Sequence, residues 1–183
     1  MSEQLFKDFI LENRADEKIC AKYEGILPNE LLDLWRRYGF GSFMGGYLRI
    51  INPEEYQELL METYFRGNIS IPILITAFGD IITLEEGEYI GIVKYKNGKF
   101  TITTRNFKRF KNNLEDDYFV EKYFDIPQYV EAEDRLGGVE KDECFGYVPL
   151  LGLGGSEKVE NLKKVKTREH IELISQLVGK IGM

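Results

Sequence analysis

Between residues 71 and 102 the chain alternates short apolar runs with pairs of turn-forming residues, and this pattern restricts the fold more than any other part of the sequence. The turns fall at Gly79-Asp80, Glu86-Gly87 and Asn97-Gly98. The β-branched and aromatic residues between them favour extended strands, and Asn-Gly between two such runs is a strong signal for a two-residue hairpin. The sequence therefore predicts an antiparallel meander in the middle of the chain.

Helical patterns lie on both sides of these strands. In the segment LPNELLDLWRRYG, for example, Leu31, Leu34 and Trp35 recur at helical spacing between a starting proline and a terminating glycine. The expected helices cover about residues 3–13, 28–38, 116–124 and 127–136, with two more that start at Asn52-Pro53 and at a Thr167 cap. We therefore expect an α+β protein with a central antiparallel sheet flanked by N-terminal and C-terminal helices.

A glycine-rich segment, GFGSFMGGYLRI, follows the helix at 28–38. Its glycines predict a loop with unusual backbone angles that leads into a short strand at about residues 47–50. Its aromatic residues Phe40, Phe43 and Tyr47 are candidate anchors for a recognition loop. Packing of the same rings in the core beside Trp35 is the favoured interpretation, because most aromatic side chains serve packing.

Length and composition fit one folded domain. The chain has 183 residues, of which 43% are hydrophobic and 13% aromatic, enough to build a core without disulfides. Cys20 and Cys144 stand alone, with no spacing typical of a zinc site. The N-terminus lacks the apolar core of a signal peptide, and no apolar run is long enough to span a bilayer. We expect a single cytoplasmic domain over residues 1–183.

Charge is distributed unevenly. The net charge is −7, and residues 112–143 hold 11 acidic side chains against 3 basic ones. Such a balance disfavours direct binding to a nucleic-acid backbone. A short basic cluster lies immediately before the acidic stretch, at Arg105, Lys108, Arg109 and Lys111. The stretch is either a solvated surface or a binding surface for a basic partner.

The residues that usually carry catalysis are sparse. His170 is the only histidine, no acid and nucleophile pair with it in a recognisable pattern, and the neighbours Asp142, Glu143 and Cys144 lack further ligands at metal-binding spacing. We predict neither an enzyme nor a cofactor or metal. The alternative is a small phosphorylated ligand, or an enzyme substrate, held by the Gly152–Gly155 loop in a pocket that contains His170. The loop lacks a GK[ST] ending, so a structural turn is favoured.

Two longer stretches resemble a known family. Residues 27–56 contain a proline-started helix, the run Trp-Arg-Arg-Tyr-Gly-Phe-Gly and an Asn-Pro helix start, and resemble the GAD-like domain. Residues 135–177 contain DECFGYVP, LGLGG and Glu169-His170 in that order, and resemble the C-terminal domain of type VI secretion immunity proteins. The layout is also similar to immunity proteins of the SUKH type. On this basis the domain has possible sub-parts at 1–66 and 67–183.

The resemblance implies a protein that binds and neutralises a cognate toxin, and the acidic stretch suggests a nuclease whose basic cleft is covered. No active-site residue is implied. The predicted partner-binding residues are Glu85, Glu86, Glu88, Asp116, Asp117, Glu131, Glu133 and Asp134. A SUKH-like regulatory scaffold is a further alternative. The expected partner is a protein, with no direct nucleic acid and no membrane, and the sequence leaves the oligomeric state open.

Overall fold

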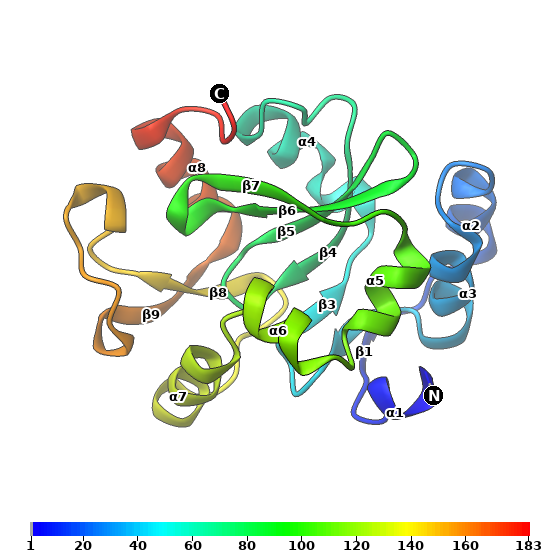
Figure 1. The fold of residues 1–183 in the computed structure, drawn as a ribbon, viewed down its shortest axis with the longest axis horizontal. Coiled ribbons are helices and arrows are strands. Elements are labelled where there is room, and N and C mark those ends of the chain that lie inside the picture. Colours follow the sequence, from blue (N-terminus) through cyan, green and yellow to red (C-terminus); the bar gives the residue numbers. More distant parts are fainter. Residues whose placement is uncertain (1) are drawn as a thin grey trace.

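The central sheet of the computed structural model, which describes residues 2–183, contains seven antiparallel strands in chain order (Figure 1). The strands are β1 (Ile10–Asn13), β2 (Phe40–Phe43), β3 (Leu48–Ile50), β4 (Ile71–Thr76), β5 (Ile81–Glu85), β6 (Tyr89–Lys94) and β7 (Lys99–Thr104). β1 and β7 form the two edges. The predicted meander is confirmed, and it extends further toward the N-terminus than residue 71.

Helices cover both faces of the sheet. They are α1 (Ser2–Leu5), α2 (Glu17–Tyr23), α3 (Asn29–Tyr38), α4 (Pro53–Thr63), α5 (Phe107–Asn113), α6 (Asp117–Tyr123), α7 (Ile126–Leu136) and α8 (Thr167–Val178). Buried side chains of α4 and α8 pack with Ile75, Ile81 and Val93 on one face, whereas α3, α5, α6 and α7 contribute to the core on the other. Figure 1 shows α4 and α8 on the opposite side of the sheet from α5 and α6. The α+β class is therefore confirmed.

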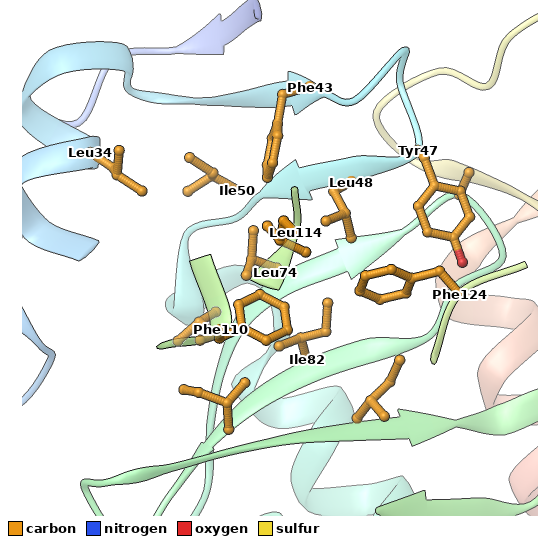
Figure 2. Close-up of a cluster of buried hydrophobic side chains, with 14 of the residues drawn as sticks. Leu34, Phe43, Tyr47, Leu48, Ile50, Leu74, Ile82, Phe110, Leu114 and Phe124 are labelled. Carbon is orange, nitrogen blue, oxygen red and sulfur yellow. The ribbon is translucent and has the colours of Figure 1, made fainter. Parts of the chain in front are cut away.

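The larger core lies under α5 and α6. Leu48, Leu74 and Ile82 come from three neighbouring strands, and Figure 2 shows them beside Phe110 of α5 and Phe124, the residue after α6. All five are at most 4% exposed. Alternation along the strands explains this arrangement, because successive side chains point to opposite faces of a sheet. Ile81 and Ile82 accordingly belong to different cores.

A second, two-stranded sheet joins β8 (Glu143–Tyr147) to β9 (Leu162–Lys166). The segment 142–166 thus contains a strand near each end. Two 3₁₀ turns, η2 (Leu151–Leu153) and η3 (Val159–Asn161), lie between them. The backbone N–H of Phe145 donates to the Ala77 carbonyl at 2.7 Å, which attaches this small sheet to the β4–β5 turn.

The helix expected over residues 3–13 is wrong beyond its first turn. α1 ends at Leu5, and residues 10–13 form β1, which pairs with β2. Phe6 remains buried, with its ring 4.8 Å from that of Phe43. Backbone pairing with a strand about 30 residues away outweighs a short helical repeat, whose intrinsic stability is small at this length.

Caps explain where several helices begin and end. The Asn52 side chain accepts a hydrogen bond from the Glu54 N–H at the start of α4, and Gly39 ends α3 with φ of 80°. The predicted Thr167 cap is wrong in detail, because Thr167 is the first residue of α8, the cap position is Lys166, and no side chain caps this helix. Instead, the Thr167 N–H donates to the Asp142 carbonyl at 2.9 Å.

Three local features differ from the expected pattern. α2 and α5 were not predicted, and each starts at a side-chain cap, Asp16 and Asn106 respectively. The β6–β7 connection has four residues, because the 3₁₀ turn η1 (Tyr95–Asn97) precedes Gly98 and Lys94 pairs with Lys99.

None of the helices described here is both long and apolar enough to cross a membrane.

Candidate functional site

Five of the predicted partner-binding acids lie on α6 and α7 or at the start of α6. Asp116 caps α6 by accepting a hydrogen bond from the Phe119 N–H at 2.8 Å, and Asp117 is the first residue of the helix. Glu131 and Asp134 are exposed on α7, and Glu133 is half-buried. The two helices are consecutive in the chain, separated by residues 124 and 125 (Figure 1). The structure thus places this part of the predicted set on two consecutive helices.

The other three acids belong to the β5–β6 hairpin and differ in their surroundings. Glu86 forms an ion pair with Arg66 at 2.7 Å, and Glu88 forms one with Arg105 at 2.8 Å. Glu85 is only 2% exposed, so its predicted position on a binding surface is wrong. It follows the alternation of β5 and points under α4, away from solvent.

Four side chains satisfy the buried Glu85 carboxylate. Thr83 and Ser70 donate hydrogen bonds at 2.7 and 2.6 Å, Tyr64 donates at 3.1 Å, and Arg66 forms an ion pair at 3.2 Å. A buried carboxylate is tolerated only with such partners. Glu85 therefore has a structural role in joining β5 to the segment after α4.

Ion pairing separates the two groups of acids. Among the residues that the structure describes, no ion pair involves Asp116, Asp117, Glu131, Glu133 or Asp134. Glu115 and Glu121 of the same region are exposed and equally free of ion pairs in the described chain. We refer to these seven side chains as the α6–α7 acids. Their charges are not neutralised locally and are available to a partner.

Two exposed apolar side chains accompany these acids. Tyr118 of α6 is 74% exposed, and Val130 of α7 is 55% exposed. Exposed tyrosines are enriched among the residues that dominate protein–protein binding. Neither residue stands out in the sequence alone. Helical periodicity could have predicted that Tyr118 is exposed, because its neighbour Phe119 is the buried residue of α6.

The aromatic residues of the glycine-rich segment belong to the core. Phe40, Phe43 and Tyr47 are at most 6% exposed, and the Phe40 ring lies 5.0 Å from that of Trp35. The Tyr47 hydroxyl accepts a hydrogen bond from the Asp125 N–H at 3.1 Å. The favoured packing interpretation is therefore confirmed, and these rings help to hold α7 in place.

A cavity of about 480 Å³ lies between the β6–β7 loop, the end of β8, the η2 turn and α8. It contains His170 and Gly152, as the ligand-binding alternative predicted, and also Lys96 and Tyr147. The N–H groups of Leu153, Gly154 and Gly155, however, donate to carbonyls of residues 150 and 151. These groups are therefore not free to cradle a phosphate.

Charged groups are buried next to this cavity. The Lys96 ammonium forms an ion pair with Asp125 at 2.7 Å and lies 4.5 Å from the centre of the Phe78 ring. Asp80 is fully buried, and neither carboxylate oxygen has a hydrogen-bond partner in the described chain. Burial raises the pKa of Asp80 to about 7, although the nearby Lys96 and Lys94 oppose the shift.

Cysteine and metal chemistry find little support. Cys20 and Cys144 are free, buried thiols, and burial raises the pKa of Cys144 to about 12. A buried thiol with a raised pKa is a poor nucleophile. Within residues 2–183 no group of three or more His, Cys, Asp or Glu side chains is arranged to hold a metal ion.

Comparison with known protein families finds the same two domains, in the same order, that the sequence motifs resemble. Residues 3–96 match the model of the GAD-like domain, and residues 104–178 match the model described as T6SS immunity protein Tdi1, C-terminal. Among curated proteins, no sequence matches this chain.

A solved structure shares the fold. The crystal structure of Atu4351 from Agrobacterium tumefaciens superposes with a TM-score of 0.75 at 21% sequence identity, covering 96% of this chain and 89% of that one. The two family matches together support an immunity role in type VI secretion. The chain therefore belongs to the GAD-like domain family, and its C-terminal part is of the kind found in the type VI secretion immunity protein Tdi1.

Proposed function

We propose that this protein binds a cognate toxin of type VI secretion in the cytoplasm, and that it neutralises a nuclease by covering the basic cleft that holds the nucleic acid. The observation that carries the proposal is the match of residues 104–178 to an immunity protein domain. The activity is binding and not catalysis, in keeping with the scarcity of catalytic groups in the sequence.

The α6–α7 acids support the location of the binding surface. A nuclease must present positive charge where it holds phosphates, so an acidic surface gains steered association and competes with the substrate. The hairpin acids contribute less to this field, because Glu86 and Glu88 are neutralised by arginines and Glu85 is buried. The proposed contact set is accordingly Asp116, Asp117, Glu131, Glu133 and Asp134, with Tyr118 and Val130 as apolar anchors.

A pair of matched charge reversals tests the surface. The variant Glu131→Lys/Asp134→Lys changes two exposed acids on α7, and Glu58→Lys/Glu62→Lys changes two exposed acids on α4 that likewise lack ion pairs in the described chain. Both variants alter the net charge by the same amount. We expect the α7 variant alone to bind the toxin encoded beside this gene at least about tenfold more weakly at low salt and to lose protection in co-expression.

Four outcomes separate the parts of the proposal. Equal loss in both variants means that overall charge matters and the α7 surface does not. Unchanged binding in both rejects the α6–α7 surface but leaves immunity intact. Absence of protection by the unmodified protein rejects the immunity role itself, whereas protection against a toxin that does not cleave DNA or RNA rejects only the nuclease.

A further inference from the structure

The cavity beside α8 has the size and the composition of a small-molecule site. Its volume of about 480 Å³ falls within the usual range for such sites. It is bounded by segments that are distant in sequence, namely the β6–β7 loop, β8, the η2 turn and α8. In Figure 1 the β6–β7 turn lies close to α8 and to the β8–β9 sheet. The fold therefore assembles this cavity from four separate elements.

Two of its polar side chains lie in the cavity wall without a hydrogen-bond partner in the described chain. Tyr147 is 3% exposed and His170 is 9% exposed, and both line the cavity. Neither the Tyr147 hydroxyl nor the His170 ring forms a hydrogen bond within the described part of the chain. Neither group is among the fully buried polar atoms that lack a partner in the described chain, so the Tyr147 hydroxyl and the His170 ring nitrogens are accessible from the cavity. A bound molecule with a hydrogen-bond acceptor would satisfy both groups.

Lys96 supplies a fixed positive charge in the same cavity. Its side chain is only 7% exposed, and the ion pair with Asp125 and the contact with the Phe78 ring hold the ammonium in place. An ammonium has three N–H donors, so donors remain after Asp125 is bound. Lys96 also counteracts the rise that burial causes in the pKa of Tyr147, which places its charge near that hydroxyl.

The charged side chains on the cavity lining are lysines, one of which is paired with Asp125 at 2.7 Å. Lys96 and Lys180 line it, and no Asp or Glu side chain from the described residues does. The remaining wall is largely apolar, formed by Leu150, Leu151, Ile174, Leu177 and Val178. Leu177 and Val178 are 42% and 50% exposed, so the apolar wall is open to solvent. The lining thus combines one buried cation and two hydrogen-bonding groups with an apolar surface.

We infer that this cavity binds a small carboxylate whose apolar body packs against α8 and the η2 turn, with the carboxylate contacting Lys96, Tyr147 and His170. A carboxylate suits the site better than a phosphate, because the N–H groups of Leu153, Gly154 and Gly155 are already bonded within the turn. The inference concerns a separate site from the α6–α7 acids and does not depend on toxin binding.

Three isosteric probes test the chemistry of the site. The full-length protein is titrated with 3-phenylpropionate, 3-phenylpropanamide and 3-phenylpropylamine, and backbone and imidazole chemical shifts are followed by NMR. We expect saturable shifts at Gly98, Tyr147, His170 and Ile174 with 3-phenylpropionate, at a Kd of about 1 mM or tighter. The neutral amide should bind at least about tenfold more weakly, because it lacks the charge that Lys96 stabilises. The amine and inorganic phosphate should not bind.

Variants distinguish binding at this site from nonspecific binding of an apolar anion to the protein surface. Tyr147→Phe removes a hydroxyl that makes no hydrogen bond in the described fold, so it should weaken 3-phenylpropionate binding about tenfold and leave the melting temperature unchanged. Leu177→Trp should block the cavity and abolish the shifts at His170. Tyr89→Phe, which alters a half-buried tyrosine elsewhere, serves as the matched control and should bind as the unmodified protein does.

The inference fails if no saturable shifts occur at the cavity residues, or if the three probes bind equally well. It also fails if Tyr147→Phe binds 3-phenylpropionate as tightly as Tyr89→Phe. Toxin binding is measured separately in the α7 charge-reversal variants, so failure at this cavity leaves the proposed immunity function untouched.

Discussion

Glu85 shows how neighbouring acids can have unrelated roles. In the sequence Glu85, Glu86 and Glu88 form one acidic turn, and all three were expected on a binding surface. In the structure Glu85 is the last residue of β5 and points into the protein, where Tyr64, Arg66, Ser70 and Thr83 surround its carboxylate. Burial depends on which face of the strand is covered by α4, and the turn alone carries no such information.

Gly146 explains part of the motif DECFGYVP. A β-carbon at this position would lie 2.5 Å from the His170 Cε1 atom and 2.8 Å from a Val165 methyl group. The imidazole therefore packs directly on the glycine backbone, and the two motif residues are in contact although 24 positions apart in the sequence. Their pairing is a matter of packing.

Asp80 should make stability depend on pH. Its folded-state pKa of about 7 lies above the ordinary value of 3.8, so the folded protein binds an extra proton between these values. Stability should fall as the pH rises from about 4 to about 7, by an amount on the order of 4 kcal/mol. Lys94, Lys96 and Asp125 face the same carboxyl and share in the titration.

The variant Asp80→Asn isolates this effect, because the amide does not titrate. Urea unfolding at a series of pH values should show that the unmodified protein loses stability relative to Asp80→Asn across this range. An identical pH dependence in both proteins would show that Asp80 is ionised in the folded state throughout.

At the scale of elements, α6 is defined by its local sequence but acquires its role from its surroundings. The pattern predicted a helix over about residues 116–124, and in the structure Asp116 caps it and Phe119 anchors it in the core. The exposure of Tyr118 and the absence of ion pairs from the adjacent acids depend on what packs nearby. Neighbouring elements leave the Tyr118 side chain 74% exposed. This helix therefore presents an aromatic ring among acidic side chains that form no ion pair in the described chain.

Tyr118→Ala should separate binding from stability. Because the side chain is 74% exposed, its removal should change the free energy of unfolding by no more than about 0.5 kcal/mol. If Tyr118 anchors the toxin, calorimetry should show a Kd raised about 30-fold. Ile69→Ala, which truncates another exposed apolar residue outside the α6–α7 region, should leave the Kd unchanged. A Tyr118→Ala protein that binds as tightly as the control removes this residue from the proposed surface.

At the scale of the whole molecule, the two family matches meet within one sheet. The first matched segment ends at residue 96, in the β6–β7 turn, and the second begins at residue 104, the last residue of β7. The larger core draws on both segments, with Tyr47 and Phe78 from the first and Phe119 and Phe145 from the second. The Phe145 N–H bond to Ala77 also joins them. We therefore propose that residues 1–183 form one domain.

One domain of this kind should unfold in a single cooperative step. Trp35, buried in α3, reports on the N-terminal segment through its fluorescence, whereas far-ultraviolet circular dichroism reports on all elements. The two signals should give coincident transitions in urea. Separate midpoints would show that the segments fold independently.

The sequence alone determined the features that depend on neighbouring residues. The turns at Gly79-Asp80 and Glu86-Gly87, the Asn52 cap and the Gly39 end of α3 follow from backbone angles and short-range hydrogen bonds, which a few consecutive residues specify. Tertiary structure decided the rest. β1 became a strand because β2 offers it a partner, Glu85 was buried because α4 covers its strand face, and the cavity exists because four distant elements meet. Each of these outcomes depends on contacts between residues far apart in the chain, which local patterns do not encode.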